Sequence, residues 1–171
     1  MTFSSTKARD QHLVLIDGHA LAFYCWFGSG GLSMLYDFIE ELKDVLGRLK
    51  PTHLVVTFDP PPPTFRHEIF PEYKANRPPV PEGFLEECEE IFETLRILKI
   101  PFYMETGYEA DDLLGTITRK SHNNGFNTTI LTSDLDLLQL TSNDVEVEVF
   151  SQYWPTRTFN VESAKNRFGG I

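Results

Sequence analysis

The chain has 171 residues, of which 41% are hydrophobic and 23% charged. This composition fits one compact globular domain and excludes the collagen-like, coiled-coil and disordered classes. No apolar run approaches the roughly 18 residues of a membrane span, and the start, MTFSSTKARDQH, has no signal-peptide pattern, so we expect an intracellular protein without membrane contact. The 25 acidic and 15 basic residues give a net charge of −10, which alone argues against nucleic-acid binding unless bound cations offset the carboxylates.

The polar residues 1–11 predict a frayed amino terminus, and apolar periodicity then predicts alternating strands and helices. In chain order we expect a strand at 12–16, a helix at 32–49, a strand at 53–58, a helix at 81–99, a strand at 100–105, a helix ending near 124, a strand at 127–132, an edge strand at 145–150 that is half exposed, and a short helix capped by Asn160. Residues 60–80 show neither period, which is typical of a functional loop. Cys25 and Cys88 lie in helix patterns without a CxxC pair, so we expect two buried free thiols.

Alternation of strands and helices predicts an α/β domain over residues 12–171, with a mainly parallel sheet between two helical layers. Parallel strands bring their carboxyl ends to one edge of the sheet, where ligands of open α/β folds bind. Asp17, Asp59 and Asp134 each follow a predicted strand. We therefore expect these three aspartates to gather at that edge.

Four more carboxylates belong to the same predicted region: Glu109, Asp111 and Asp112 at a helix start, and Asp136 just beyond Asp134. Clustered carboxylates repel one another, and such clusters usually hold cations. Oxygen ligands without clustered His or Cys favour Mg²⁺ or Mn²⁺ over zinc, and two such ions could activate a water and stabilise the leaving oxygen of a phosphodiester.

Simpler roles for the same acids stay open. Thr106 and Glu109 have the spacing of a capping box, and Asp111 and Asp112 suit the helix dipole without a metal. Asp134 could simply cap a short LDLLQL helix.

The predicted loop interleaves cations with aromatic side chains, a pattern that is typical of gripping a nucleic-acid backbone and stacking a base. The residues are Phe65, Arg66, His67, Phe70, Tyr73, Lys74 and Arg77. A solvated loop whose aromatic rings pack on the core is the alternative.

Four motifs resemble the amino-terminal part of bacterial 5′-3′ exonucleases, the flap-endonuclease-like domain of DNA polymerase I and its stand-alone phage and organellar relatives. They are LIDGHALAF (15–23), VVTFDPPPPTFRHEIFPEYKANRPPVPEGF (55–84), GYEADDLLG (107–115) and ILTSDLDLLQL (130–140). The resemblance implies a PIN-like, resolvase-like fold and magnesium-dependent hydrolysis of DNA near 5′ ends or flaps, in DNA replication and repair. An RNA–DNA hybrid is a second implied substrate.

Carried over by motif, the resemblance assigns the first metal site to Asp17, Asp59, Glu109, Asp111 and Asp112, and the second to Asp134 and Asp136. Lys74 and Arg77 would be the catalytic cations at the scissile phosphate, with Arg66 and Tyr73 binding DNA beside them in a helical arch or its base.

The chain departs from the family pattern at several places. Tyr24 and Leu135 stand where the family usually has Arg and Lys, and the stretch between Phe27 and the following helix is shortened to GSGGLS. The sequence ends at Ile171, before the family's GDxSDN acids and its helix-hairpin-helix region. We therefore expect a metal-dependent 5′-3′ exonuclease or flap endonuclease domain that is truncated at its carboxyl terminus, or else a weakened module of the same fold that binds nucleic acid or a partner. A phosphatase acting on small substrates is disfavoured because no DxDxT motif follows the first strand.

Overall fold

The computed structural model describes residues 11–28 and 33–169, so the expectation of a frayed amino terminus falls almost wholly outside the described residues, as does most of the GSGGLS stretch. The elements are β1 (His12–Asp17), α1 (Gly18–Gly28), α2 (Met34–Leu49), β2 (His53–Thr57), α3 (Phe65–Ile69), α4 (Phe84–Ile97), β3 (Phe102–Tyr103), α5 (Ala110–Asn123), β4 (Asn127–Thr132), the 3₁₀ helix η1 (Leu135–Leu140), β5 (Val145–Val149), β6 (Arg157–Phe159) and α6 (Val161–Arg167).

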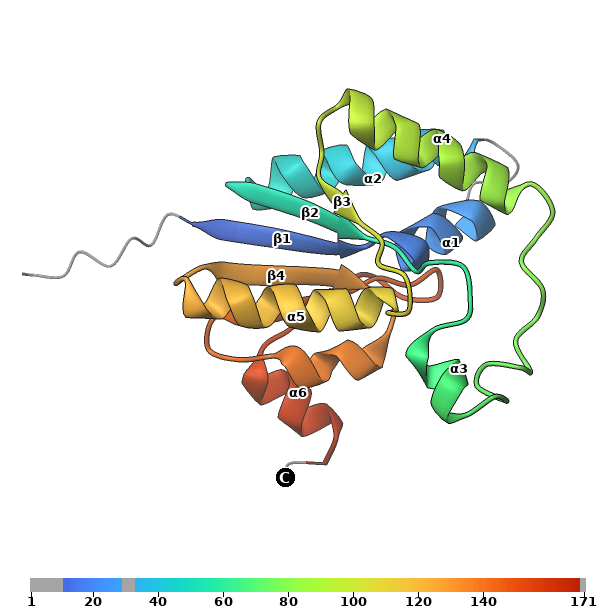
Figure 1. The fold of residues 1–171 in the computed structure, drawn as a ribbon. Coiled ribbons are helices and arrows are strands. Elements are labelled where there is room, and N and C mark those ends of the chain that lie inside the picture. Colours follow the sequence, from blue (N-terminus) through green and yellow to red (C-terminus); the bar gives the residue numbers. More distant parts are fainter. Residues whose placement is uncertain (1–10, 29–32, 170–171) are drawn as a thin grey trace, which may run out of the picture.

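The six strands form one sheet in the order β3-β2-β1-β4-β5-β6. All pairs are parallel except β5 with β6, which is antiparallel. Helices α1, α2 and α4 lie on one face of the sheet, and α5, η1 and α6 lie on the other (Figure 1). This arrangement confirms the expected three-layer α/β fold with a mainly parallel sheet.

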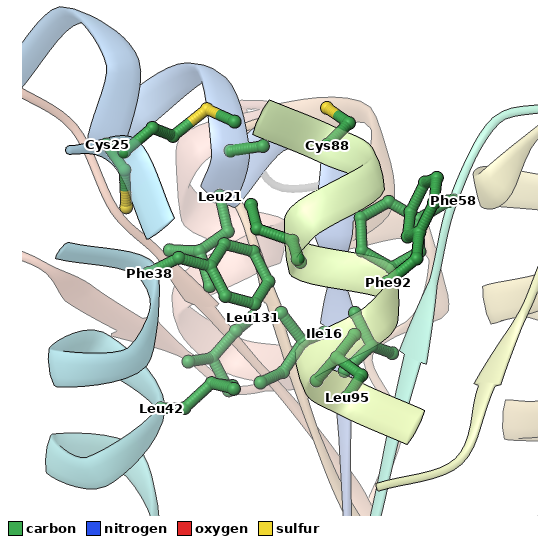
Figure 2. Close-up of a cluster of buried hydrophobic side chains, with 14 of the residues drawn as sticks. Ile16, Leu21, Cys25, Phe38, Leu42, Phe58, Cys88, Phe92, Leu95 and Leu131 are labelled. Carbon is green, nitrogen blue, oxygen red and sulfur yellow. The ribbon is translucent and has the colours of Figure 1, made fainter. Parts of the chain in front are cut away.

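Each face of the sheet has its own apolar core. Ile16 and Leu131 from the sheet pack with Phe38 and Leu42 of α2 and with the apolar side of α4 (Figure 2). Leu15, Ile130 and Val147 pack on the opposite face with Leu114 of α5. Strands β1 and β2 carry the apolar runs LVLI and LVV, which is typical of parallel strands with both faces covered.

Helix α2 shows how the local sequence sets these boundaries. Ser33 Oγ accepts a hydrogen bond from the Tyr36 backbone N–H at 3.4 Å and caps the amino terminus of the helix. Lys50 ends the helix in the left-handed conformation, with φ of 45°, and Pro51 prevents further helical hydrogen bonding.

Two element predictions are wrong. Strand β5 lies between β4 and β6 rather than at an edge, and four of its five residues are buried. Its acidic Glu148 is tolerated inside because Arg48 of α2 pairs with it at 2.8 Å. Residues 60–80 are not free of regular structure, because Phe65 begins the five-residue helix α3, with Thr64 as its N-cap.

Cys25 and Cys88 are both free and buried, as predicted. Among the described residues, no helix is long and apolar enough to cross a bilayer.

Candidate functional site

Asp17 ends β1 at the carboxyl edge of the sheet, and its side chain is only 7% exposed. The Ala20 backbone N–H donates to Oδ1 at 3.0 Å, and the Thr132 hydroxyl donates to Oδ2 at 2.9 Å. Burial raises the pKa of Asp17 to about 7, and repulsion from Asp111 and Asp59 acts in the same direction. The fold therefore holds a poorly solvated carboxyl group in a fixed position.

Asp59 follows β2 and joins three segments of the chain. Its Oδ1 accepts a hydrogen bond from the Ala110 backbone N–H at the start of α5, at 2.6 Å. Its own backbone N–H donates to His19 Nδ1 of α1 at 2.8 Å. Because Nδ1 is the acceptor, the proton of a neutral His19 ring sits on Nε2.

Asp111 and Asp134 complete the group. Burial raises the pKa of Asp111 to about 6, and the next causes are the negative charges of Asp134 and Asp59. The Asp134 backbone N–H donates to Thr132 Oγ1 at 3.0 Å, so Thr132 connects Asp134 to Asp17. We call the four carboxylates Asp17, Asp59, Asp111 and Asp134 the acidic edge. The expected gathering of Asp17, Asp59 and Asp134 is confirmed.

The side chains of Glu109 and Asp112 contact residues 65–77, which we call the basic segment. Figure 1 shows this segment beyond the amino terminus of α5. Arg66 donates to both oxygens of Asp112, at 2.6 and 2.9 Å. The side chain of Glu109 is buried and accepts from Lys74 Nζ at 2.6 Å and from the Tyr73 hydroxyl at 3.0 Å. The hydrogen bonds from Arg66 hold the pKa of Asp112 below its ordinary value.

Two predicted site residues lie apart from these contacts. Arg77 is exposed at the end of the basic segment. Asp136 is exposed and lines a groove between η1 and α6 together with Lys165 and Phe168. Its backbone N–H, rather than its carboxylate, contacts the acidic edge, by donating to Asp134 Oδ1 at 2.8 Å.

The simpler roles considered for these acids are partly correct. Asp134 does cap η1. The capping box at Thr106 is wrong, because Glu109 is the residue that precedes α5, and its backbone N–H donates to Asp112 Oδ2 at 3.0 Å. Glu109 and Asp112 thus bind the basic segment and shape the helix start with the same side chains.

His19 and Thr132 take part in this site without having been predicted from the sequence. Each acts by a hydrogen bond to a residue far away in the chain, at Asp59 and Asp17 respectively. A DGH turn and a strand-end threonine carry no sequence signal for such contacts.

The acidic edge fits hard divalent cations in charge and in donor type. It offers only carboxylate oxygens, and burial, followed by repulsion between the carboxylates, raises the pKa values of Asp17 and Asp111. Within the described ranges, no three His, Cys, Asp or Glu side chains are already close enough to enclose an ion. Mg²⁺ usually keeps several waters and binds through one or two carboxylates, so it does not require such an enclosure.

Comparison with known proteins gives relatives along nearly the whole chain. The chain is 36% identical over 172 residues to DNA polymerase I of Chloroflexus aurantiacus, in an alignment that covers 93% of this chain and 18% of that protein. DNA polymerase I of Bacillus caldotenax is 34% identical, with 92% and 19% covered. The chain therefore spans about a fifth of the length of these relatives.

Solved structures agree on the fold. The T5 D15 protein co-crystallised with metal ions superposes with a TM-score of 0.78 at 20% identity, over 92% of this chain and 60% of that one. Human GEN1 in complex with Holliday junction DNA gives a TM-score of 0.57 at 17% identity, over 92% and 40% of the two chains. The family model described as the 5′-3′ exonuclease, N-terminal resolvase-like domain matches residues 12–169. The chain therefore belongs to the family of 5′-3′ exonuclease N-terminal resolvase-like domains.

Proposed function

We propose that this chain is a metal-dependent nuclease domain that hydrolyses phosphodiester bonds near the 5′ ends or flaps of DNA. The observation that carries the proposal is the acidic edge, where four carboxylates lie near enough to repel one another electrostatically, next to a segment rich in cations and aromatic rings. Family membership supports the same reaction. Complexes of related folds with DNA, such as the T5 D15 flap endonuclease, support DNA as the substrate.

Asp17, Asp59, Asp111 and Asp134 are the residues that would hold Mg²⁺ or Mn²⁺, with two ions expected. Bound there, such ions would supply an activated water and positive charge for the leaving oxygen. Asp136 reaches a second ion only if η1 turns its side chain away from the groove beside α6.

The basic segment is proposed to bind the DNA backbone. Lys74 and Arg77 would neutralise the charge that develops on the phosphate, while Arg66 and Tyr73 contact the flanking nucleotides. Lys74 Nζ forms an ion pair with Glu109 Oε1 at 2.6 Å. To bind a phosphate, Lys74 must therefore exchange the carboxylate oxygen of Glu109 for a phosphate oxygen. An RNA–DNA hybrid presents the same phosphates and is a second candidate substrate.

Cleavage of a 5′-flap DNA by the 171-residue chain in Mg²⁺ tests the proposal, with product and bound DNA followed together. We expect Asp59→Asn and Asp111→Asn each to reduce cleavage by about a hundredfold or more, because each removes charge from the acidic edge. Glu146→Gln is the matched control, since Glu146 is exposed on β5 away from the edge. Undiminished cleavage in both aspartate variants would refute the assignment. Binding by the wild type without product in Mg²⁺ or Mn²⁺ would support a binding module instead.

A further inference from the structure

Thr132 is the last residue of β4 and lies fully buried at the carboxyl edge of the sheet. Its backbone is held by β5, since Val149 is its register partner and its carbonyl oxygen accepts a hydrogen bond from the Phe150 N–H at 3.0 Å. A β-branched side chain on a paired strand has few available rotamers. The hydroxyl group of Thr132 therefore has a well-defined position.

This hydroxyl group joins two segments of the acidic edge. Oγ1 donates to Asp17 Oδ2 at 2.9 Å and accepts from the Asp134 backbone N–H at 3.0 Å. The hydroxyl has one proton, and Asp17 receives it because the Asp134 N–H is itself a donor. Accepting a hydrogen bond also polarises the hydroxyl group and strengthens its donation to Asp17.

A local turn accounts for only one of these two hydrogen bonds. A threonine hydroxyl that accepts from the backbone N–H two residues later is a common turn contact. The bond to Asp17 is different, because it joins residues that are 115 positions apart in sequence. Asp17 Oδ1 already accepts from the Ala20 N–H at 3.0 Å, so a bond to Oδ2 fixes the orientation of the whole carboxylate.

Asp134 has less support from burial than Asp17, because it is exposed between β4 and η1. Its Oδ1 accepts from the Asp136 N–H at 2.8 Å, and its own backbone N–H is bound to the buried Thr132. In the part of the chain that the structure describes, the other hydrogen bonds to carboxylates of the acidic edge come from backbone N–H groups. Thr132 is thus the side chain that fixes an exposed carboxylate relative to a buried one.

We propose that Thr132 is a positioning residue of the metal site, which keeps the carboxylates of Asp17 and Asp134 in a fixed relative position. This inference rests on the proposed function, in which both carboxylates hold Mg²⁺ or Mn²⁺. Thr132 acts through the two carboxylates and does not contact the ion. Carboxylate ligands of metal ions are themselves held by hydrogen bonds, and loss of such a bond costs about 10–100-fold in metal affinity.

The test is Mn²⁺ binding by the 171-residue chain, measured from the electron paramagnetic resonance signal of the free ion at constant ionic strength. We expect saturable binding by the wild type and an apparent Kd about tenfold higher for Thr132→Val. Valine has nearly the shape of threonine but neither donates nor accepts a hydrogen bond through its side chain. Thr132→Ser keeps the hydroxyl group and should bind Mn²⁺ nearly as tightly as the wild type.

Thr129→Val is the matched control. Thr129 is also buried on β4, and its Oγ1 shares a hydrogen bond of 2.9 Å with Nε2 of His12, at the opposite end of the sheet. This variant loses a buried hydroxyl group of the same kind without a change at the acidic edge, so its Mn²⁺ affinity should equal that of the wild type.

Thermal melts check that each variant is folded. If Thr132→Val does not melt cooperatively, Thr132→Cys takes its place, because a thiol is only a weak donor and a weak acceptor. Cleavage of the 5′-flap DNA gives an independent readout. The Mg²⁺ concentration for half-maximal cleavage should rise about tenfold in Thr132→Val, while the rate at saturating Mg²⁺ falls less.

The outcomes separate this inference from the proposed function. Equal Mn²⁺ affinity of the wild type and Thr132→Val would overturn the role of Thr132 and leave the metal site in place. Equal weakening by Thr129→Val, or weak binding by Thr132→Ser, would overturn it as well. If the wild type shows no saturable Mn²⁺ binding, the metal site itself is refuted, and this inference with it.

Discussion

At the scale of single residues, the four carboxylates of the acidic edge differ in burial, from Asp17, which is buried, to Asp134, which is exposed. Asp17 is the most buried of its four carboxylates, and two hydrogen bonds offset its burial only in part. Its pKa stays near 7, against an ordinary value of 3.8. The folded protein therefore binds a proton at Asp17 more tightly than the unfolded chain does.

This difference predicts how stability changes with pH. Below pH 3.8 the group is protonated in both states and costs nothing, and as the pH rises towards 7 the ionised carboxylate increasingly favours unfolding. In metal-free buffer we expect Asp17→Asn to raise the free energy of unfolding at pH 8 by about 2 kcal/mol, and the difference to disappear near pH 4. Urea denaturation at the two pH values measures it.

Asp136→Asn is the control for that experiment, because Asp136 is exposed on η1 and should change stability by less than about 0.5 kcal/mol. A variant Asp17→Asn that is less stable than the wild type at pH 8 would show that hydrogen bonding, rather than uncompensated charge, dominates at this position.

The sequence predicted which residues belong to the site more completely than it predicted which residues they contact. Strand-end aspartates mark the edge because parallel strands all end there, and Asp17, Asp59 and Asp134 need no further information. The partners of Glu109 and Asp112 depend on where the basic segment folds back, which no local pattern encodes. Asp136 points away because residues two apart on a 3₁₀ helix lie on different sides.

At the scale of elements, the turn from β1 into α1 depends on close packing. A Cβ atom on Gly18 would lie 2.4 Å from the Phe58 ring, which is fully buried between α1, α2 and α4. Helix α1 can therefore start directly after Asp17 only because Gly18 has no side chain.

We expect Gly18→Ala to destabilise the fold by about 2 kcal/mol or more, because the Phe58 ring has no free space into which to move. Gly47→Ala in α2 is the matched comparison, since nothing lies within 4 Å of its added Cβ atom. There the lower flexibility of alanine should stabilise the helix by about 0.5–1 kcal/mol. Equal urea midpoints for the two variants would contradict this account.

A second prediction at this scale concerns the basic segment. It is tied to α5 by the ion pairs of Arg66 with Asp112 and of Lys74 with Glu109, both partly shielded from solvent. Replacing Arg66 and Lys74 together by Gln should increase the rate of Glu-C protease cleavage after the exposed Glu72 about tenfold, because each pair contributes roughly 0.5–1 kcal/mol.

Arg77→Gln serves as the control for the loss of the two ion pairs. Arg77 is exposed, so its substitution should leave the cleavage rate unchanged. If the double variant is cut no faster than wild type, the segment is held by its aromatic contacts, such as Phe65 with Tyr108.

Element type followed from the local sequence where both faces of a strand are buried, as in 127–132, which matches β4 residue for residue. It failed where a charge is neutralised over a long distance. The alternation at 145–150 indicated an exposed edge, but Arg48, 100 residues away in sequence, takes up the charge of Glu148. Helix α3 was missed because five residues are too few to show a period.

At the scale of the whole molecule, the net charge of −10 on 171 residues means that acidic side chains repel one another, and part of this repulsion is concentrated at the acidic edge. Salt should therefore stabilise the fold in general, and divalent cations should do so more strongly through the edge.

We expect MgCl₂ to raise the melting temperature of the chain by several degrees more than NaCl at equal ionic strength. The excess should be lost in the Asp59→Asn, Asp111→Asn double variant, and differential scanning calorimetry at pH 8 measures both effects. Equal stabilisation by the two salts would mean that the edge binds no divalent ion at these concentrations.

The two outermost strands of the sheet are its shortest. β3 has two residues and β6 has three, whereas the strands between them have five or six. An outer strand with open backbone N–H and C=O groups is a template on which another chain can add a strand and start aggregation. Short outer strands leave few such groups to pair with, so the apolar inner strands are shielded from edge-to-edge association.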